Sequence, residues 1–386
     1  MAEPLALIAA WARSAVAPHG GAFRALAAHD IGTPVLQALL QRAGVAPEAV
    51  DAVVLGNALG AGGNPARMLA LAAGLPDRCA ALSVDTQCCA GLDAVAVGVG
   101  LIASGQAQVV VAGGAEAWSR APIRQHRPLS PDEPAVPYER PAFAPDPARD
   151  PDLLQAAADY AAAEGVTRME QDRYALESHA KALAQREALA AEIVPVAGLA
   201  HDAYPRAMGA AMAARLPVQA RSAEATSADC AVSTLAISPR ADGAALVLLM
   251  SPMAARRLGI EARAQWVASA SVGADPAMPL LAAESAAHEA LRRSGIASPQ
   301  ALDVVELHDA FAVQGLAFCR GLGLSTDTVN RRGGGIARGH PIGASGAMAL
   351  VRVLGDLQQQ GRGGANGLAA VAGAGGIGAA TVVRWL

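Results

Sequence analysis

The chain has 386 residues, of which 53% are hydrophobic, 17% charged and 3% aromatic. This length fits two or three packed units, and this composition excludes a disordered chain. The formal net charge of −4 is spread without long runs of one sign, so we expect neither nucleic acid nor a membrane as a partner. The first ten residues have no basic segment and only a short apolar stretch, which favours a cytoplasmic protein over a secreted or membrane-spanning one.

The first 118 residues alternate between segments typical of strands and segments typical of helices. Expected strands lie at residues 5–10, 52–55, 81–84 and 109–112, and expected helices at 32–43, 65–73 and 91–103. Such alternation predicts an α/β fold with a parallel sheet.

The composition changes between Pro122 and Pro151, where nine prolines predict a long loop without regular elements. Residues 153–192 then favour two helices broken near Gly165, and Thr167 with Glu170 fits a capping box at the start of the second. A strand pattern resumes at residues 244–250.

The chain contains an internal repeat, because residues 38–55 resemble residues 290–307 when one inserted residue is allowed. The following segments correspond as well. A helix that opens after Cys88 leads to the strand at 109–112, and a helix that opens after His340 leads to a strand at 368–371. The repeat predicts two similar halves in which Cys88 and His340 occupy equivalent places.

Five cysteines, an odd number without metal-binding spacing, indicate reduced thiols and no metal site. Cys88 lies between a strand and the start of a helix rich in small residues, near unpaired N–H groups and the positive end of the helix dipole. Such a position is expected to lower the pKa of the thiol and make it a nucleophile. A buried core cysteine is the alternative interpretation.

Two histidines have settings that core packing explains poorly. His340 lies in a glycine-rich loop at a helix start, with Pro341 at a suitable first helical position. His308 follows a buried strand at its carboxyl end, where active sites of α/β proteins gather, although a hydrogen-bonded structural histidine is the alternative. We predict that Cys88, His340 and His308 converge.

The segment from Gly373 to Gly378 matches the dinucleotide fingerprint, but only eight residues follow it. A dinucleotide site needs a further helix, a strand and an acidic residue, so none is built there. These glycines instead predict a tight turn at Ala374 and Gly375 that brings backbone N–H groups close to a substrate.

Motifs along nearly the whole chain resemble the thiolase superfamily, and they lie at residues 56–57, 64–67, 84–92, 111–122, 171–179, 193–196, 242–245 and 333–346. The resemblance implies two similar βαβαβαββ halves in a five-layer α/β/α/β/α core with an inserted loop domain. We expect residues 1–120 with 240–270 to form the N-terminal half. Residues 121–239 would form a loop domain that binds acyl-CoA, and residues 271–386 the C-terminal half.

Carried over by position, the resemblance makes Cys88 the acyl-accepting nucleophile, His340 its base and Ser238 a substrate-binding residue. His308 stands where most thiolases have an asparagine, although sterol-carrier-type thiolases also begin this motif with His-Asp. Ala372 stands where the family has its second catalytic cysteine, so the usual acid/base thiol is missing.

The resemblance therefore implies an acetyl-CoA C-acyltransferase-like enzyme that forms or cleaves a carbon–carbon bond by Claisen chemistry. Coenzyme A would be a substrate or product, with no metal or tightly bound cofactor. A homodimer or homotetramer is expected, and an accessory subunit is conceivable. Two alternatives stay open: a decarboxylative condensing enzyme or acyltransferase to a non-CoA acceptor, and a degenerate, non-catalytic acyl-CoA-binding subunit.

Overall fold

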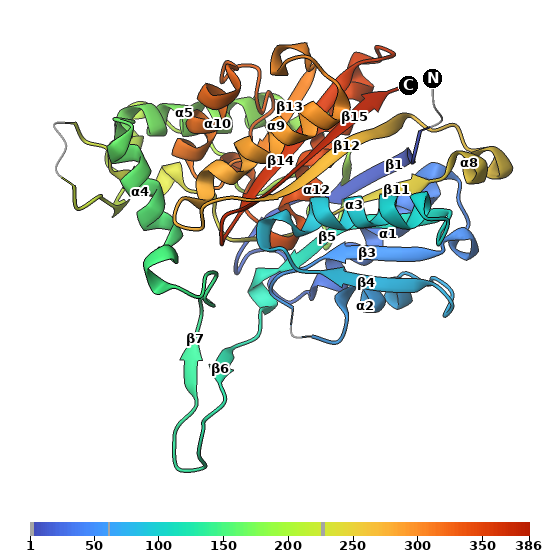
Figure 1. The fold of residues 1–386 in the computed structure, drawn as a ribbon, viewed down its shortest axis with the longest axis horizontal. Coiled ribbons are helices and arrows are strands. Elements are labelled where there is room, and N and C mark those ends of the chain that lie inside the picture. The colour runs from blue at the N-terminus through green and yellow to red at the C-terminus, as the bar shows by residue number, and fades with distance from the viewer. Residues whose placement is uncertain (1–3, 61, 225–227) are drawn as a thin grey trace.

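The first half of the chain builds a mixed sheet covered by helices (Figure 1). A computed structural model describes residues 4–60, 62–224 and 228–386; residues 1–3, which belong to the segment used above to argue against a signal peptide, lie outside them. The strands of this half are β1 (Leu7–Ser14), β3 (Ala52–Gly56), β4 (Ala80–Val84), β5 (Val109–Ala117) and β11 (Ala241–Met250). Its helices are α1 (Ala28–Ala43), α2 (Pro65–Ala72) and α3 (Ala90–Ala103). β3 pairs in parallel with β4 and β5, as the sequence predicts, and β11 runs antiparallel to β1 and β5.

The second half repeats this plan. Its strands are β12 (Ala264–Gly273), β13 (Val304–His308), β14 (Asn366–Gly373) and β15 (Ile377–Trp385). Its helices are α9 (Ala282–Ser294), α10 (Ala312–Leu322), α11 (Gly335–Arg338) and α12 (Ile342–Gln360), and α8 (Pro252–Leu258) joins the halves. An isolated parallel bridge between Val305 and Val329 stands where the first half has the β3–β4 pairing. β12 pairs with β15 along its length.

Helices lie on both sides of each half and between the two halves. One core cluster packs α1 and α2 on the first half, a second fills the space around α3 and α12, and a third packs α9 and α10 on the second half. A short β1–β12 pairing joins the strands of both halves into one sheet of order β13-β14-β15-β12-β1-β11-β5-β3-β4, with β2 (Ala17–Pro18) and β8 (Ile193–Val194) beside it. This is the five-layer arrangement that the repeat and the resemblance predict.

The inserted segment holds a helical part and a projecting arm. The expected pair of helices is α4 (Leu153–Ala163) and α5 (Arg168–Ala184), and the Thr167 backbone N–H donates to Glu170 Oε2 at 2.8 Å in the predicted capping box. Two short helices, α6 (Arg186–Leu189) and α7 (Ala210–Ala213), follow in this part. The strands β9 (Val218–Ala220) and β10 (Val232–Ser233) pair beside them in the chain.

The proline-rich segment was expected to lack regular elements, and this is wrong. β6 (Arg124–His126) and β7 (Val136–Tyr138) form a hairpin that extends away from the rest of the chain (Figure 1). β7 tolerates Pro137, which has no backbone N–H. In a two-stranded ribbon the outer edge of each strand faces no further strand, so no interstrand hydrogen bond is lost there. No helix in the described residues is long and apolar enough to cross a membrane.

The two helices of the middle layer approach each other closely because side chains are missing where they meet. A Cβ added to Gly91 of α3 would lie 2.8 Å from the backbone nitrogen of Ala347 in α12. A Cβ added to Gly343 would lie 2.6 Å from the Cα of Asn57, which follows β3. Cys88 and His340 stand just before these two helices, so this packing brings the two residues together.

We predict that Gly91→Ala destabilises the protein by about 1–3 kcal/mol, because the added methyl group overpacks the contact between α3 and α12. Gly100 lies in the same helix with no atom within 4 Å of an added Cβ, so Gly100→Ala is the matched control. It should be neutral or stabilise by up to about 1 kcal/mol through helix propensity. Urea unfolding of both variants measures the difference, and equal stabilities would contradict the proposed close contact.

Candidate active site

A strained turn presents Cys88 between β4 and α3. Gln87 has a φ of 53°, in the left-handed region that non-glycine residues rarely adopt. The Asp85 carboxylate holds it there by accepting hydrogen bonds from the Gln87 backbone N–H at 3.0 Å and side-chain amide at 3.1 Å. The Thr86 hydroxyl donates to Asp93 Oδ2 at 2.6 Å, which ties the turn to α3. Strain of this kind is maintained at sites where geometry matters for function.

The thiol of Cys88 lies 3.1 Å from Nε2 of His340. The other ring nitrogen, Nδ1, is 2.7 Å from the hydroxyl oxygen of Ser345. Ser345 donates its only proton to the Pro341 carbonyl at 3.0 Å, so it accepts from Nδ1–H of His340. This hydrogen-bond network assigns the tautomer in which Nε2 has a free lone pair directed at the thiol.

Burial keeps both members of this pair neutral. It raises the pKa of the Cys88 thiol to about 12, and the negative charges of Glu116 and Asp85 act in the same direction. The backbone N–H groups of Ala374 and Cys88 act in the opposite direction but do not compensate. Burial also lowers the pKa of His340 to about 4. The sequence-based expectation of a lowered thiol pKa is therefore wrong, because desolvation outweighs the helix start.

His308, at the end of β13, is the third residue predicted to lie at this site. Its ring stacks on that of His340, with ring centroids 4.3 Å apart and planes inclined by 25°. The residue is buried, and neither ring nitrogen has a hydrogen-bond partner. Burial, with smaller effects of His340 and Arg338, holds the pKa of His308 well below its usual value. Gly335 makes room for this ring, since an added Cβ would lie 2.6 Å from His308 Cε1.

The glycine-rich segment after Ala372 forms the turn of the β14–β15 hairpin. Gly375 and Gly376 adopt φ values of 81° and 72°, which favour glycine. A strand follows this segment, where the dinucleotide fingerprint requires a helix, so the structure agrees with its rejection. The turn brings the Ala374 N–H to the Cys88 thiol, and Phe143 of the proline-rich segment lies against Gly375.

Two further predicted positions have simpler surroundings. The Ser238 hydroxyl donates to the Gly335 carbonyl at 2.6 Å, and its N–H donates to the Ala310 carbonyl at 2.8 Å. Ser238 thus connects the loops that carry the two histidines, and its role toward substrate stays a prediction. Ala372 lies near the end of β14 and contributes only a methyl group.

Sequence reasoning did not single out two residues that shape the site, Ser345 and Glu116. The buried Glu116 carboxylate accepts hydrogen bonds at 2.9 Å from the backbone N–H groups of Ala58 and Gly343, and one at 2.8 Å from the Asn57 amide. It therefore connects the end of β3 to the start of α12, next to His340. Burial raises the pKa of Glu116 to about 7. Glu116 belongs to a motif of the resemblance, but nothing in the sequence placed it beside α12.

Comparison with known proteins assigns this site to a family. Residues 6–253 match the thiolase N-terminal domain, and residues 260–385 match the thiolase C-terminal domain. The chain belongs to the thiolase family. It is therefore an acyltransferase that depends on coenzyme A, as the resemblance implies.

Relatives of this thiolase match it over almost their full lengths. An acetyl-CoA acetyltransferase of Rhizobium meliloti is 37% identical and covers 100% of both chains, and one of Allochromatium vinosum is 35% identical and covers 96% of this chain and 97% of its own. Among solved structures, an acetyl-CoA acetyltransferase of Bacillus anthracis has a TM-score of 0.88 at 31% identity, with 100% of both chains covered. The Acat5 thiolase of Ascaris suum in complex with coenzyme A has a TM-score of 0.88 at 27% identity, covering 99% of this chain and 100% of its own.

We predict that Ser345→Ala slows acylation of Cys88 by about tenfold, which corresponds to the loss of one hydrogen bond. Without the Ser345 acceptor, His340 is free to adopt the tautomer in which Nε2 carries the proton and cannot accept another. The rate is measured by intact-protein mass spectrometry after rapid mixing with acetyl-CoA. Ser104→Ala removes an exposed serine of similar local bonding and is the control; an unchanged rate in Ser345→Ala would show that Ser345 does not set the tautomer.

Proposed function

We propose that this thiolase forms an acyl thioester on Cys88 from an acyl-CoA, and that it uses this intermediate to make or cleave the carbon–carbon bond of a 3-ketoacyl-CoA. The observation that carries the proposal is the 3.1 Å contact between Cys88 Sγ and the unprotonated Nε2 of His340. A nucleophile within hydrogen-bond reach of a base oriented by a third group is the arrangement that covalent catalysis needs.

In the first half-reaction, His340 Nε2 takes the thiol proton while Cys88 Sγ attacks the thioester carbonyl carbon. The negative charge that develops on the carbonyl oxygen is stabilised by the backbone N–H groups of Cys88 and Ala374. The carbon–sulfur bond to coenzyme A then breaks, and the leaving thiolate takes the proton from His340. Because the resting pair is neutral, the proton moves only as the new bond forms.

In the carbon–carbon bond step, a proton leaves the α-carbon of a second acyl-CoA, or returns to it during cleavage. Ala372 has no group that transfers a proton, so an imidazole must do so. We assign this role to His308, because both of its ring nitrogens are free and it can accept a proton at one while releasing one at the other. His340 Nδ1 is occupied by Ser345 and its Nε2 has no proton to donate, so the enolate is stabilised by the protonated His308.

Coenzyme A serves as substrate or product, and the mechanism uses no metal or tightly bound cofactor. We place acyl-CoA binding in the loop domain, residues 121–239, because its Phe143 lies against the turn that carries Ala374 and Gly375. We also propose a homodimer that pairs through β4. This strand ends the sheet order, and Leu82 of β4 with Met68 and Leu71 of α2 is 40–46% exposed.

A decarboxylative condensation is the second candidate. Loss of CO₂ from a malonyl-type donor creates the enolate without a base, so an imidazole N–H that donates a hydrogen bond to the enolate oxygen suffices. The stacked His308 and His340 and the methyl group of Ala372 favour this candidate. A non-catalytic subunit is disfavoured, because the Cys88–His340–Ser345 chain of hydrogen bonds is complete.

We predict that Cys88 is the residue acylated by acyl-CoA, and that His340→Ala lowers the acylation rate by roughly 10²-fold or more. His340 must be unprotonated to act, and its lowered pKa means that the rate should stay level at neutral pH and fall only as pH approaches about 4. Intact-protein mass spectrometry with a panel of acyl-CoAs gives the rate, and peptide mapping gives the position.

Cys89 is the internal control, because its thiol faces the Val371 and Ile377 carbonyls instead of a base. An acyl adduct that persists in Cys88→Ser, or a wild-type rate in His340→Ala, would refute this assignment.

We predict that His308→Asn lowers cleavage of a 3-ketoacyl-CoA by roughly 10²-fold or more while leaving acylation of Cys88 by acetyl-CoA nearly intact. Asparagine donates a hydrogen bond but does not carry a proton between two sites.

A second comparison concerns Ala372. Wild type and Ala372→Cys are assayed for cleavage of a 3-ketoacyl-CoA and for condensation with malonyl-CoA, and the added thiol should increase cleavage. Fast malonyl-dependent condensation without cleavage in either protein would favour the decarboxylative candidate.

A further inference from the structure

Behind His308, a second titratable side chain lies on the same strand and the same face. Glu306 precedes His308 by two residues in β13, and alternate strand residues share a face. The residues between and beside them, Val305 and Leu307, pack into the outer cluster around α9, so Glu306 and His308 face α12. Glu306 is fully buried and His308 is 1% exposed.

The polar groups around Glu306 lack partners to an unusual extent. Neither carboxylate oxygen of Glu306 accepts a hydrogen bond, and neither ring nitrogen of His308 makes one. Nε and Nη2 of the buried Arg338 and Nε of the buried Arg352 have no partner either. Buried polar atoms are nearly always hydrogen-bonded, so a concentration of unpartnered atoms indicates a position for bound water.

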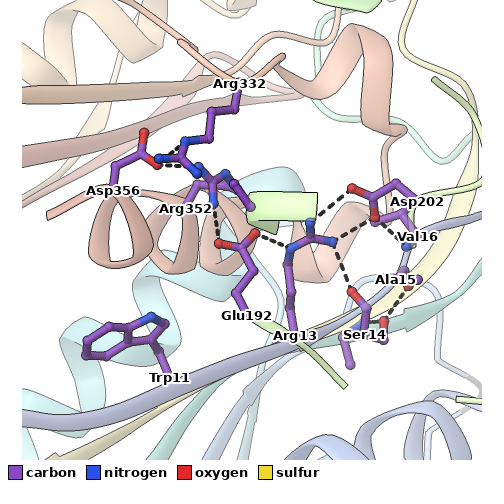
Figure 2. Close-up of polar contacts among 12 residues, drawn as sticks. Trp11, Arg13, Ser14, Ala15, Val16, Glu192, Asp202, Arg332, Arg352 and Asp356 are labelled. Atoms are coloured by element: carbon purple, nitrogen blue, oxygen red, sulfur yellow. Dashed lines mark hydrogen bonds and ion pairs between the residues drawn. The ribbon is translucent and has the colours of Figure 1, made fainter. Parts of the chain in front are cut away.

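The neighbouring carboxylates are already paired, as Figure 2 shows. Asp356 accepts from Arg352 at 2.6 Å and from Arg332 at 2.8 Å, and Glu192 binds both Arg352 and Arg13. Asp202 binds Arg13 at 2.7 Å. Among the described carboxylates around Arg352, Glu306 is thus the one without a hydrogen bond, and its proton is not committed to an ion pair.

The backbone spacing of Glu306 and His308, which are two residues apart in β13, is close to the span of one bridging water. Two residues along a strand span about 6.6 Å. A water that accepts from one group and donates to the other spans about 5.5 Å between heavy atoms. One water between the two side chains would satisfy a ring nitrogen of His308 and a carboxyl oxygen of Glu306 at once.

From this placement we infer that Glu306 acts through His308 as its proton partner, over a bridging water, in the carbon–carbon bond step. The inference rests on the proposed function. In condensation, His308 takes the α-proton at one nitrogen and releases the proton of its other nitrogen through the water to the Glu306 carboxylate. In cleavage the same atoms move in reverse: the enolate carbon takes a proton from His308, and the Glu306 carboxyl group replaces it. Glu306 does not touch substrate and is a positioning residue.

Burial and the neighbouring charges together determine the pKa of Glu306. Burial raises its pKa to about 8, and the facing groups partly oppose one another. These groups are Arg352 and Asp356 of α12, Arg338 of α11, and Glu192 before β8. Below about pH 8 Glu306 is protonated and supplies the proton that cleavage needs. Above about pH 8 it is ionised, so the cleavage rate should decrease and the condensation rate should increase as the pH rises through this value.

The test compares wild type with Glu306→Gln, which has nearly the same shape as a protonated glutamic acid and should fold. Cleavage of acetoacetyl-CoA by coenzyme A is followed from about pH 6 to pH 9.5, and acylation of Cys88 by acetyl-CoA is measured in parallel. We expect Glu306→Gln to lower cleavage about 10²-fold, the low end for a positioned proton-transfer group. It should also remove the inflection near pH 8 and leave acylation within about twofold.

Two further variants separate a proton-transfer role from a packing role. Glu306→Asp keeps a carboxyl group and should restore both the inflection and part of the rate. Glu192→Gln removes another buried carboxylate that faces Arg352, and it should lower thermal stability but keep an inflection, moved to lower pH because the charge of Glu192 raises the pKa of Glu306.

Retention of the inflection in Glu306→Gln, or a parallel fall of acylation and cleavage, would overturn the inference. A wild-type protein that acylates Cys88 but neither cleaves 3-ketoacyl-CoA nor condenses acyl-CoA would overturn the proposed carbon–carbon chemistry itself. These failures are distinguishable, because the first two are seen only in the variant and the third in wild type.

Discussion

The active site depends on one packing constraint, the close approach of the amino ends of α3 and α12. Each helix comes from one half of the chain, and each is preceded by one reactive residue, Cys88 or His340. Glycines at 91 and 346 lack the side chains that would otherwise keep these helices apart, and Gly343 makes room for Asn57 after β3. Glu116 also holds the start of α12 against the end of β3, because its carboxylate accepts hydrogen bonds from the N–H groups of Ala58 and Gly343. Two similar halves become one site because their middle helices fit together in a single register.

The same packing determines the electrostatics of the site. Helix ends that meet in the centre of a five-layer core exclude water, and exclusion of water disfavours every charged form. The thiol and both imidazoles are therefore neutral, although the Ala374 N–H and the helix start favour a thiolate. The Ala374 N–H and the helix start contribute only partial charges, whereas the desolvation penalty applies to the full charge of a thiolate. Desolvation therefore dominates. In the mechanism we propose, reactivity then depends on a short proton path from Cys88 to His340 and not on a permanent ion pair.

Much of this arrangement was predictable from the sequence. The repeat of residues 38–55 at 290–307 placed Cys88 and His340 at equivalent helix starts, and this is where the structure has them. The order of strands and helices in the first half followed from patterns of hydrophobic residues, because those patterns report directly on burial.

Other features depend on three-dimensional arrangements that the sequence patterns do not show. Ser345 sets the tautomer of His340 only because the first turn of α12 faces back toward its own start. The raised pKa of Cys88 reflects burial by the second half, which no local motif contains. The number of prolines argues against strands at β6 and β7, but a two-stranded ribbon accommodates Pro137 because the outer edge of each strand makes no hydrogen bonds to another strand.

The resemblance implies that Ala372 replaces a catalytic thiol, and such a replacement is consistent with a site from which water is excluded. A thiol acts as a base only as a thiolate, and burial raises the pKa of Cys88 and of Cys319 to about 12 here. An imidazole acts as a base in its neutral form, so the burial that hinders a thiol keeps His308 ready to accept a proton. Once His308 has accepted a proton, however, burial disfavours its charged form. The resulting imidazolium is stacked on His340 and close to Arg338, and it is unstable there. A base of this kind must pass its proton on at once, and it therefore needs an acceptor behind it. Glu306 lies where such an acceptor is required.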